Sequence, residues 1–431
     1  MSVLKASDMI VWINSAIKRS EGGALKNLFH LFNLSNLMKS LKALDGSKAL
    51  GIDGISKADY LTNHEENLKQ LLIQLHQGSY TPKAKREILI PKSNGSMRPI
   101  AIGCIEDKTV EKLLSEILNA IYEPIFCAQS FGFRPNLSCH HAIVETHENL
   151  SGKDAFKYVV EIDFANFFNT VNHRLLMKIL RKKISNKKLL SLIHRLLTSK
   201  IQHENGTIVE AEVGTPQGGI ASPILANIYL NFVVDEWFKE KYPKGRMVRY
   251  ADDGLFFFKN SQMAQAFLED FKQRVEKYKL KLNVEKTKMV DLSNQSQESL
   301  TFLGFTFYKG RNRKSRGRLV MVKTAKEKLI KTISNLTEWI KKSRSSMKTG
   351  QLLTQLNIKL RGHYNYFGYW CNFTSLHRIY RETRKALFKW LNRRSQLKSL
   401  PLDKFKMLAQ KTILAPPDRM HLKELGWSPY V

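Results

Sequence analysis

One stretch decides the fold of this chain, Arg246-Met247-Val248-Arg249-Tyr250-Ala251-Asp252-Asp253-Gly254-Leu255-Phe256-Phe257-Phe258-Lys259. Its two ends are rich in β-branched and aromatic residues, which predicts short strands at 246–250 and 255–259 around a turn that carries two adjacent aspartates. Two carboxylates at one hairpin tip repel each other, so the pair requires a compensating cation. Hard divalent ions such as Mg²⁺ prefer these oxygen ligands. Because Asp-Asp pairs also occur in ordinary surface turns, the rest of the chain must decide between the two interpretations.

A third carboxylate, Asp163, comes directly after a strand predicted over residues 156–162. Alone, an acid at a strand end is more often a helix cap or a turn residue. Together with Asp252 and Asp253 it can hold two Mg²⁺ ions about 3.5–4 Å apart. One ion would lower the pKa of a primer 3′-OH, and the other would stabilise the pyrophosphate leaving group. The three aspartates therefore predict two-metal nucleotidyl transfer.

The charge of the chain predicts a polyanionic partner. The sequence has 431 residues and a formal net charge of +32, with 70 Lys and Arg against 38 Asp and Glu. Residues 309–395 alone contain 23 basic and three acidic residues, a net charge of +20. A short charged run is usually a solvated surface, but this length, with aromatics interleaved, favours nucleic acid. A membrane surface is the weaker alternative because no apolar anchor lies beside the charge.

Several other classes of protein are disfavoured by composition. No apolar run approaches the roughly 18 residues of a membrane span, and the N-terminus lacks the apolar core of a secretory signal, so we expect a cytoplasmic protein without a membrane partner. The scattered cysteines predict reduced thiols. The cluster Cys139-His140-His141 lacks the second Cys/His cluster that a zinc site needs. The four cysteines are Cys104, Cys127, Cys139 and Cys371.

The pattern of elements is mixed α and β first, then helical. The predicted elements of the first part are helices within 1–45, a turn at 51–54 and a helix ending at Gly78. Strands 86–90 and 97–102, joined by the Asn94-Gly95 turn, and a helix over 107–122 come next. Further along we predict helices within 172–197, a helix with Ser222 as N-cap and Pro223 at its first position, and a strand over 302–308. After Gly317 no strand pattern recurs, and we expect helices to about residue 394. The domain boundary is predicted near residues 309–320.

Several motifs, in order along the chain, resemble those of reverse transcriptases. Tyr250-Ala251-Asp252-Asp253 is similar to their YxDD box, and Asp163 matches the first catalytic aspartate. The segment 214–223 contains QGxxxSP, the form typical of reverse transcriptases encoded by group II introns. The segments 51–54, 130–135 and 302–305 resemble further blocks, so the likeness runs from about residue 36 to 396.

This resemblance implies an α+β right-hand polymerase with fingers, palm and an α-helical thumb or maturase domain. The implied domains are an N-terminal helical extension (1–35), fingers and palm (36–312), the helical thumb (313–396) and a short tail (397–431). Many relatives end in an H-N-H endonuclease with paired cysteines. Only about 35 residues come after Arg394, and none is Cys. We therefore expect no DNA cleavage by this chain.

The resemblance also assigns nucleotide contacts. Lys92 and Arg98, which flank the predicted hairpin, would hold the triphosphate, although two solvated charges are the alternative. Phe168 matches the bulky residue that excludes a ribose 2′-OH and selects deoxynucleotides; core burial is the alternative, favoured for its neighbour Phe167. The full nucleotide-binding set is Lys92, Arg98, Phe164, Ala165, Phe168, Gln217 and Lys286, and the metal set is Asp163, Phe164, Asp252 and Asp253.

Template, primer and structured RNA are expected at basic and aromatic side chains. The implied contacts are Arg134, Arg361, His363, Tyr364, Arg378, Arg381, Arg384, Arg393 and Arg394. Basic side chains bind phosphates without reading sequence, and aromatics such as Tyr364, Tyr366 and Trp370 can stack on unpaired bases. Helices also need an apolar face, so core packing of these three aromatics is at least as good an interpretation.

The function predicted is an RNA-directed DNA polymerase of the group II intron type. It would use two Mg²⁺ ions, deoxynucleoside triphosphates and an RNA template with a DNA or RNA primer, and it would bind intron RNA to assist splicing and retrohoming in a bacterial or organellar setting. The main alternative is a related enzyme domesticated for phage defence or DNA repair. An RNA-binding protein with an inactive polymerase site is disfavoured because all three aspartates are present. The sequence predicts no particular oligomeric state.

Overall fold

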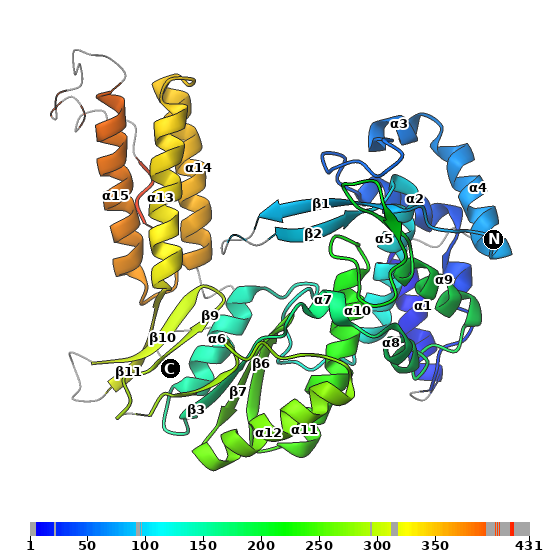
Figure 1. Cartoon of the computed structure of the whole chain (residues 1–431), viewed down its shortest axis with the longest axis horizontal. Helices are drawn as coiled ribbons and strands as arrows, with labels where there is room; N and C mark the ends of the chain where they lie inside the picture. The colour runs from blue at the N-terminus through cyan, green and yellow to red at the C-terminus, as the bar shows by residue number, and fades with distance from the viewer. Residues whose placement is uncertain are drawn as a thin grey trace. The chain divides into compact units, whose positions relative to one another are not determined.

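The computed structural model of this chain describes residues 6–20, 23–91, 95, 97–293, 295–311, 318–393, 401, 403, 405 and 414–417. The chain divides into two compact units. The first consists of Met1–Ser138, Val160–Phe256 and Gln262–Lys288, and the second of Cys139–Val159, Phe257–Ser261 and Met289–Val431. The fold is mixed α+β, as predicted (Figure 1). No helix in the described part of the chain is long and apolar enough to cross a membrane.

The elements up to residue 258 are, in chain order, α1 (Ala6–Arg19), η1 (Phe29–Leu31), α2 (Leu34–Ala43), α3 (Lys57–Thr62), α4 (His64–Gln77), β1 (Lys85–Pro91), β2 (Met97–Ile102), α5 (Ile105–Tyr122), α6 (Cys139–Leu150), β3 (Tyr158–Ile162), α7 (Phe167–Thr170), α8 (His173–Leu180), α9 (Lys187–Leu197), β4 (Ile201–Gln202), β5 (Ile208–Val209), α10 (Ser222–Leu230), η2 (Asn231–Asp235), α11 (Glu236–Lys241), β6 (Arg246–Tyr250) and β7 (Asp253–Phe258). The later elements are α12 (Ser261–Lys277), β8 (Lys288–Asp291), β9 (Ser299–Phe302), β10 (Phe305–Arg311), β11 (Arg318–Thr324), α13 (Lys326–Ser343), α14 (Thr349–Phe367) and α15 (Phe373–Leu391).

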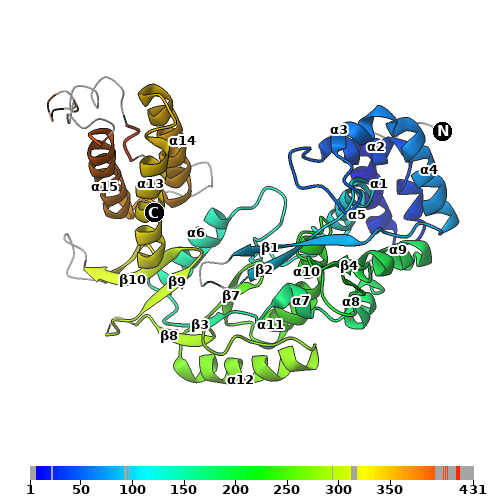
Figure 2. The ribbon, with the colours of Figure 1, turned by 45° about the horizontal axis from the view of Figure 1, so that its top comes forward.

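A long antiparallel hairpin dominates one sheet of the first unit. The predicted strands are confirmed as β1 and β2, which pair from Arg86 opposite Ile102 to Pro91 opposite Met97. The sheet order is β2-β1-β4-β5, so β2 is an edge strand and tolerates Pro99, which has no amide hydrogen to donate. The hairpin extends away from helices α2 to α5 (Figures 1 and 2). Of the predicted Asn94-Gly95 turn, Asn94 lies outside the described residues, as do residues 92, 93 and 96.

A second sheet, of order β6-β7-β3-β8, carries the stretch 246–259 with its two adjacent aspartates. Four consecutive residues of β7, 255–258, are almost completely buried. Helices α11 and α12 cover one face of this sheet (Figures 1 and 2). The ring of Phe256 packs there against Phe238 and Phe267, with centroids 4.9 and 4.6 Å away. This aromatic layer fixes β7 and therefore fixes the turn that precedes it.

The second unit contains a three-stranded meander, β11-β10-β9, and the neighbouring helices α13, α14 and α15 (Figure 1). The prediction that no strand occurs after Gly317 is wrong, because β11 pairs with β10 from Arg318 to Thr324. Val320 and Val322 are buried while Leu319 is exposed, which is the alternation of a half-buried strand. The basic residues around this short alternation made it look like the start of the helical segment. The predicted boundary near residues 309–320 falls within this hairpin.

A buried asparagine joins the meander to the helices of this unit. Asn372 is 1% exposed, and its side chain accepts a hydrogen bond from the amide of Thr324 (2.7 Å). It donates to the Thr324 hydroxyl and to the carbonyl of Phe367, both at 2.8 Å. One side chain therefore satisfies polar groups at the end of β11 and at the end of α14.

We expect Asn372→Ala to lower the free energy of unfolding by about 2 kcal/mol, because it leaves buried donors and acceptors without partners. Thermal unfolding of the purified protein would measure the effect as a melting temperature reduced by several degrees. Asn365→Ala, on the exposed side of α14, is the control and should leave the melting temperature unchanged. Equal melting temperatures for the two variants would contradict the assignment.

Candidate active site

The first unit brings the three predicted aspartates together. Asp163 comes directly after the last residue of β3, and β7, which begins at Asp253, is the neighbour of β3 in the sheet. Asp252 lies in the turn between β6 and β7, as the sequence predicted, but this turn has two residues and not four, so Asp253 is the first residue of β7. A strand end and a hairpin tip therefore meet at one edge of the sheet.

The electrostatics of these carboxylates show how closely they interact. Burial raises the pKa of Asp253 to about 7, and the charges of Asp252 and Asp163 add to the rise. Burial also raises the pKa of Asp252; Asp163 adds to that rise, whereas Arg98 and Lys286 oppose it. Because burial and like charges both disfavour ionisation, the cluster has a deficit of positive charge.

A loop after α12 holds the first aspartate. The Lys286 ammonium lies 3.1 Å from Oδ2 of Asp163, and the side-chain amide of Asn283 donates to the same oxygen at 3.0 Å. The backbone amide of Asn283 donates to the carbonyl of Asp163 at 2.8 Å. The sequence singled out Lys286 in this segment but not Asn283, although the two contact the same carboxylate. Asn283 could not be predicted from the sequence, because an asparagine three residues before a candidate lysine is too common to indicate a role.

The donor set suits a hard divalent cation. The carboxylates of Asp163, Asp252 and Asp253 and the backbone carbonyl of Phe164 would all offer oxygen atoms, the ligands that Mg²⁺ prefers. Phe164 could contribute to a metal site only through its backbone carbonyl, because its ring is buried against Phe167 and Phe271. Among the described residues no three His, Cys, Asp or Glu side chains, the three aspartates included, are arranged so that they could hold a metal ion by themselves. Mg²⁺ commonly completes its octahedron with water and substrate phosphates, so an open arrangement fits a catalytic site.

A glycine of the 130–135 segment supports the aspartate turn. Ala251 has a φ of +57°, a left-handed conformation that is uncommon for a residue with a side chain. A Cβ at Gly132 would overlap the amide nitrogen of Ala251. The carbonyl of Gly132 accepts a hydrogen bond from the side chain of Asn227 at 2.7 Å. The close approach of these two backbones is the physical reason for glycine at position 132.

The predicted sugar-selecting residue, Phe168, contacts the residue that comes after this glycine in the chain. Phe168 is half-buried, whereas Phe167 is 2% exposed, which is the difference that the sequence predicted. The ring of Phe168 makes an edge contact with Phe133, itself half-exposed, at a centroid distance of 6.3 Å. The backbone carbonyl of Phe168 accepts a hydrogen bond from the amide of Thr215 at 2.6 Å. Phe168 is thereby fixed to the 214–223 segment.

The 214–223 segment is held by a buried ion pair that the sequence did not indicate. One carboxylate oxygen of Glu111 accepts from the amides of Ile220 (2.5 Å) and Ala221 (3.3 Å), and the other lies 2.7 Å from the Lys85 ammonium. The side chains of Lys85 and Glu111 are 2% and 5% exposed. The carbonyl of Gln217 accepts from Ala101 at 2.7 Å, so this loop is also attached to β2.

The start of α10 differs from the prediction. Ser222 is the first helical residue and not the N-cap, which is Ala221. The Ser222 hydroxyl donates to the carbonyl of Pro216 at 2.8 Å. The serine therefore closes the loop in front of the helix, and the amides of Ile220 and Ala221, just before the helix, donate to Glu111.

The remaining nucleotide contacts have mixed outcomes. Arg98 is exposed on β2, and its charge acts on Asp252, which is consistent with a position at the site. Ala165 is half-buried, and its amide donates to the carbonyl of Lys281 at 2.8 Å. Lys92 lies outside the described residues.

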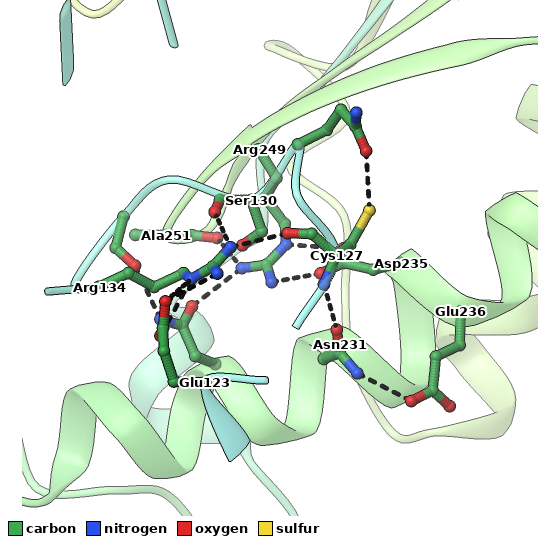
Figure 3. Close-up of polar contacts among 12 residues, drawn as sticks. Glu123, Cys127, Ser130, Arg134, Asn231, Asp235, Glu236, Arg249 and Ala251 are labelled. Atoms are coloured by element: carbon green, nitrogen blue, oxygen red, sulfur yellow. Dashed lines mark hydrogen bonds and ion pairs between the residues drawn. The ribbon is translucent and has the colours of Figure 1, made fainter. Parts of the chain in front are cut away.

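Arg134 does not have the free side chain that an RNA contact needs. Its guanidinium is paired with Glu123 at 2.8 Å and donates to the carbonyls of Cys127 and Ser130 at 2.8 and 2.7 Å. Figure 3 shows these contacts, and the side chain is 9% exposed. All three nitrogens are engaged within the protein, so the position indicates a structural role for Arg134.

The predicted RNA contacts of the second unit fall into two groups. The first group faces inward: Tyr364 is 2% exposed, and the half-buried His363 ring stacks on Phe367 at 4.6 Å. Burial also lowers the pKa of His363 to about 4, so the ring is neutral at physiological pH. For these two residues core packing is the better interpretation.

The second group is exposed. Arg361 lies on the surface of α14, and Arg393 lies just after α15, while Arg394 lies outside the described residues. Arg378, Arg381 and Arg384 line one cavity of about 740 Å³ between α13, α15 and the end of β11. Lys323 and Lys326 line the same cavity. The structure thus gathers basic residues that the sequence separates by about sixty positions.

Fold and site together define a nucleic-acid polymerase. Residues 90–307, about half of the chain, match the family described as reverse transcriptase (RNA-dependent DNA polymerase). Residues 329–408 match the group II intron, maturase-specific domain. The chain therefore belongs to the reverse transcriptase family, in the group that also has a maturase domain.

Two relatives illustrate the extent of the similarity. The chain is 31% identical over 337 residues to protein YkfC of Escherichia coli (strain K12), which covers 70% of this chain and 86% of YkfC. It is 38% identical over 168 residues to the group II intron-encoded protein LtrA of Lactococcus lactis subsp. cremoris. That alignment covers 39% of this chain and 27% of LtrA, so the chain spans about a quarter of the length of LtrA.

The raised pKa of Asp253 predicts a trade-off between stability and activity. With a pKa of about 7 in the folded state against an ordinary value of 3.8, this carboxyl binds its proton more tightly when folded. Its contribution to stability is present below about pH 4 and is lost as the pH rises through 7. We expect Asp253→Asn to avoid this loss, and to be more stable than the wild type by more than about 1 kcal/mol at pH 8 in EDTA.

Thermal unfolding at pH 5 and pH 8 without divalent ions measures this difference, which should be larger at pH 8. Asp154→Asn is the control because the Asp154 side chain is 97% exposed. The Asp253→Asn variant should also lose primer extension. A stability difference that is independent of pH would contradict the assignment of Asp253 as a buried, repelled carboxylate.

Proposed function

We propose that this chain is a group II intron-type reverse transcriptase that copies RNA into DNA and also binds intron RNA to assist splicing and retrohoming. The observation that carries the proposal is the cluster of Asp163, Asp252 and Asp253 inside a reverse transcriptase match that is succeeded by a maturase-specific match. The right-hand division into fingers, palm and thumb belongs to the same proposal. Its substrates are an RNA template, a DNA or RNA primer and deoxynucleoside triphosphates.

Two Mg²⁺ ions would be held by the three aspartates and the carbonyl of Phe164. When bound, they supply charge compensation, activation of the primer hydroxyl and stabilisation of the leaving pyrophosphate. The protein itself orients the carboxylates, whereas bound cations would favour their deprotonated form against the effects of burial and like charge. Lys286 and Asn283, which contact Asp163, orient that carboxylate.

The other side chains of the site select and orient the nucleotide. Arg98 is exposed on β2 and acts electrostatically on Asp252, so it can neutralise a triphosphate there. Phe168 is fixed by its backbone bond to Thr215 and by Phe133, and a rigid ring is a better barrier to a ribose 2′-OH than a mobile one. The loop around Gln217 is attached to β2 and to Glu111, which keeps its backbone available to a nascent base pair.

Intron RNA binding is proposed for the second unit. The cavity lined by Arg378, Arg381 and Arg384 offers several guanidinium groups to phosphates, and one of them, Arg381, also forms an exposed ion pair with Glu382 at 3.3 Å. At the end of α15, four basic side chains surround the ring of Trp390 at 4.8–5.5 Å from its centroid: Lys341, Arg344, Lys389 and Arg393. Clustered cations repel one another, and a polyanion relieves that repulsion.

The alternative of domestication for phage defence or DNA repair has no support from the comparisons. The match to the maturase-specific domain and the likeness to LtrA favour the intron type. A catalytic intron RNA in the DNA that flanks the gene would decide the question directly. The same context would identify a bacterial or organellar setting.

The polymerase proposal is tested by primer extension on an RNA template with Mg²⁺ and deoxynucleoside triphosphates. We expect the double variant Asp252→Ala/Asp253→Ala to show no extension, because the oxygen ligands are gone. It should bind intron RNA and assist splicing like the wild type, because the basic surface lies in the other unit. Extension by this variant would refute the site, and loss of splicing assistance in a folded variant would refute the separation of the two roles.

The RNA surface is tested by salt dependence. We expect the triple variant Arg378→Glu/Arg381→Glu/Arg384→Glu to bind intron RNA more weakly and to reduce the slope of log K against log salt by about two, since each lost phosphate contact on a single strand removes about 0.7. Lys239→Glu/Lys272→Glu/Lys277→Glu, on α11 and α12, changes the net charge equally at exposed positions of the first unit. If both triple variants gave the same slope, only overall charge would matter and the surface assignment would fail.

A further inference from the structure

Directly beneath the aspartate turn lies a fully buried ion pair. Arg249, in β6, is 1% exposed, and Asp235, in η2, is 0% exposed. Their charged atoms are 2.5 Å apart at Nη2–Oδ2 and 2.8 Å apart at Nε–Oδ1. Burying two charges costs solvation free energy that only excellent geometry offsets, and an apolar pair of the same volume often stabilises a core as well. Stability alone is therefore a weak reason for this pair, and the further contacts of Arg249 indicate another.

The helix that supplies Asp235 is locally distorted. Residues 231–235 form one π-helical turn between α10 and α11. A π turn inserts a residue relative to an α-helix and rotates the next helical residues, and such turns are frequent at functional sites. The distorted turn presents Asp235 to β6, where Arg249 is buried. The side chain of Asn231 in the same turn accepts from the amide of Cys127 at 3.2 Å and so attaches the 127–134 loop.

The third nitrogen of Arg249 reaches the aspartate turn itself. Nη1 donates to the carbonyl of Ala251 at 2.8 Å (Figure 3). It also donates to the side-chain oxygen of Asn227 at 3.0 Å. Ala251 is the residue with φ of +57°, and its carbonyl is the peptide oxygen that precedes Asp252. Orientation of this carbonyl sets the plane of the peptide bond from which the Asp252–Asp253 pair continues.

The opposite side of the turn is held by the same network. Asn227, which accepts from Arg249, donates to the carbonyl of Gly132, and Gly132 lies against the amide of Ala251. The backbone of Arg249 also pairs with this loop, since its carbonyl accepts from Phe131 at 2.8 Å and its amide donates to Gln129 at 2.9 Å. The guanidinium of Arg249 therefore contacts the Ala251 carbonyl directly, and through Asn227 it also holds Gly132 against the Ala251 amide.

We propose that Arg249, oriented by Asp235, is a positioning residue for the metal-binding aspartates. It holds Ala251 in its left-handed conformation and thereby directs Asp252 and Asp253 toward a common cation. This inference rests on the proposed function, because it gives a role to a group that contacts neither metal nor nucleotide. Mg²⁺ demands near-ideal octahedral geometry, so a small rotation of the turn weakens metal binding more than it weakens folding.

Lysine cannot replace arginine in this arrangement. The guanidinium donates in three directions from one plane, to Asp235, Asn227 and the Ala251 carbonyl, whereas an ammonium is a compact point charge. Arg249→Lys keeps the buried charge of Asp235 compensated but loses the bond to the turn. Asp235→Asn keeps the shape of the partner and removes the charge that orients the guanidinium.

The experiment is RNA-templated primer extension by the full chain over a range of Mg²⁺ concentrations, with circular dichroism to verify folding. We expect Arg249→Lys to raise the Mg²⁺ concentration for half-maximal rate at least fivefold and to lower kcat by 10- to 100-fold, with KM for the deoxynucleotide nearly unchanged. Asp235→Asn should shift the Mg²⁺ dependence in the same direction by a smaller factor.

A stability control separates positioning from folding. Leu192→Ala, in α9, creates a cavity at a fully buried position that has no contact with the site. It should lower the melting temperature without changing the Mg²⁺ dependence. If Arg249→Lys and Asp235→Asn behaved like Leu192→Ala, with reduced stability and an unchanged Mg²⁺ dependence, the proposal would be overturned.

Two further outcomes are distinguishable. If Arg249→Lys does not fold, the shape-conserving Asp235→Asn decides, and an unchanged Mg²⁺ dependence in that variant alone overturns the inference. If the wild type shows no RNA-templated synthesis, the proposed function fails. Binding of Mn²⁺, monitored by its paramagnetic signal, then tests the positioning role, because weaker Mn²⁺ binding by Asp235→Asn supports it and equal binding refutes it.

Discussion

The main constraint on the structure is that it must hold Asp163, Asp252 and Asp253 together at a partly buried sheet edge, although the three carboxylates repel one another. Burial and like charge raise the pKa of Asp253 to about 7, so the metal-free fold holds these carboxylates together against their electrostatic preference. Such an arrangement requires rigid supports. The aromatic layer under β7, the loop that carries Asn283 and Lys286, and the close backbone contact at Gly132 provide them. Much of the first unit can be understood as the means of keeping three repelling groups in place.

Two buried ion pairs in the first unit share one feature. Lys85–Glu111 binds backbone amides of the 214–223 segment, and Arg249–Asp235 binds the carbonyl of the aspartate turn. In each case a fully buried charge is satisfied by its partner and by main-chain groups of a loop that lacks regular secondary structure. Buried charge here fixes irregular backbone, which apolar packing cannot do because apolar side chains have no directional bonds.

The sequence predicted the parts of the site whose residue type carries the chemistry. Asp163, the Asp252–Asp253 hairpin, the β1–β2 hairpin and the contrast between Phe167 and Phe168 could be recognised from strand patterns, turn residues and motifs. The supports could not be predicted, because Arg249 looks like any charged residue in a strand and Asp235 lies in a segment with the pattern of a continuous helix. A π turn has no sequence signature, and a partner fourteen residues away has no fixed spacing. Strand β11 is not predicted because its alternation is short and is flanked by basic residues, as in the helical segment that comes after it.

Burial also separated residues that the sequence grouped together. Arg134 and Tyr364 belong to basic or aromatic motifs, yet Arg134 is paired with Glu123 and Tyr364 is in the core. Charge and aromatic content predict an RNA surface, but they do not predict which of these side chains are exposed and which are buried. Helical spacing alone places Arg378, Arg381 and Arg384 along one side of α15, whereas the lysines of β11 and α13 join them only in three dimensions.

The left-handed backbone of Ala251 limits how this protein can vary over evolutionary time. A β-branched residue at this position would be strained by the positive φ, so drift is confined to small or unbranched side chains there. Gly132 faces the main chain of Ala251, not its side chain, so no replacement at 251 can make room for a larger residue at 132. The two positions are 119 residues apart in the chain, yet neither can compensate for the other. A larger residue at position 132 therefore cannot be accommodated by any substitution at position 251.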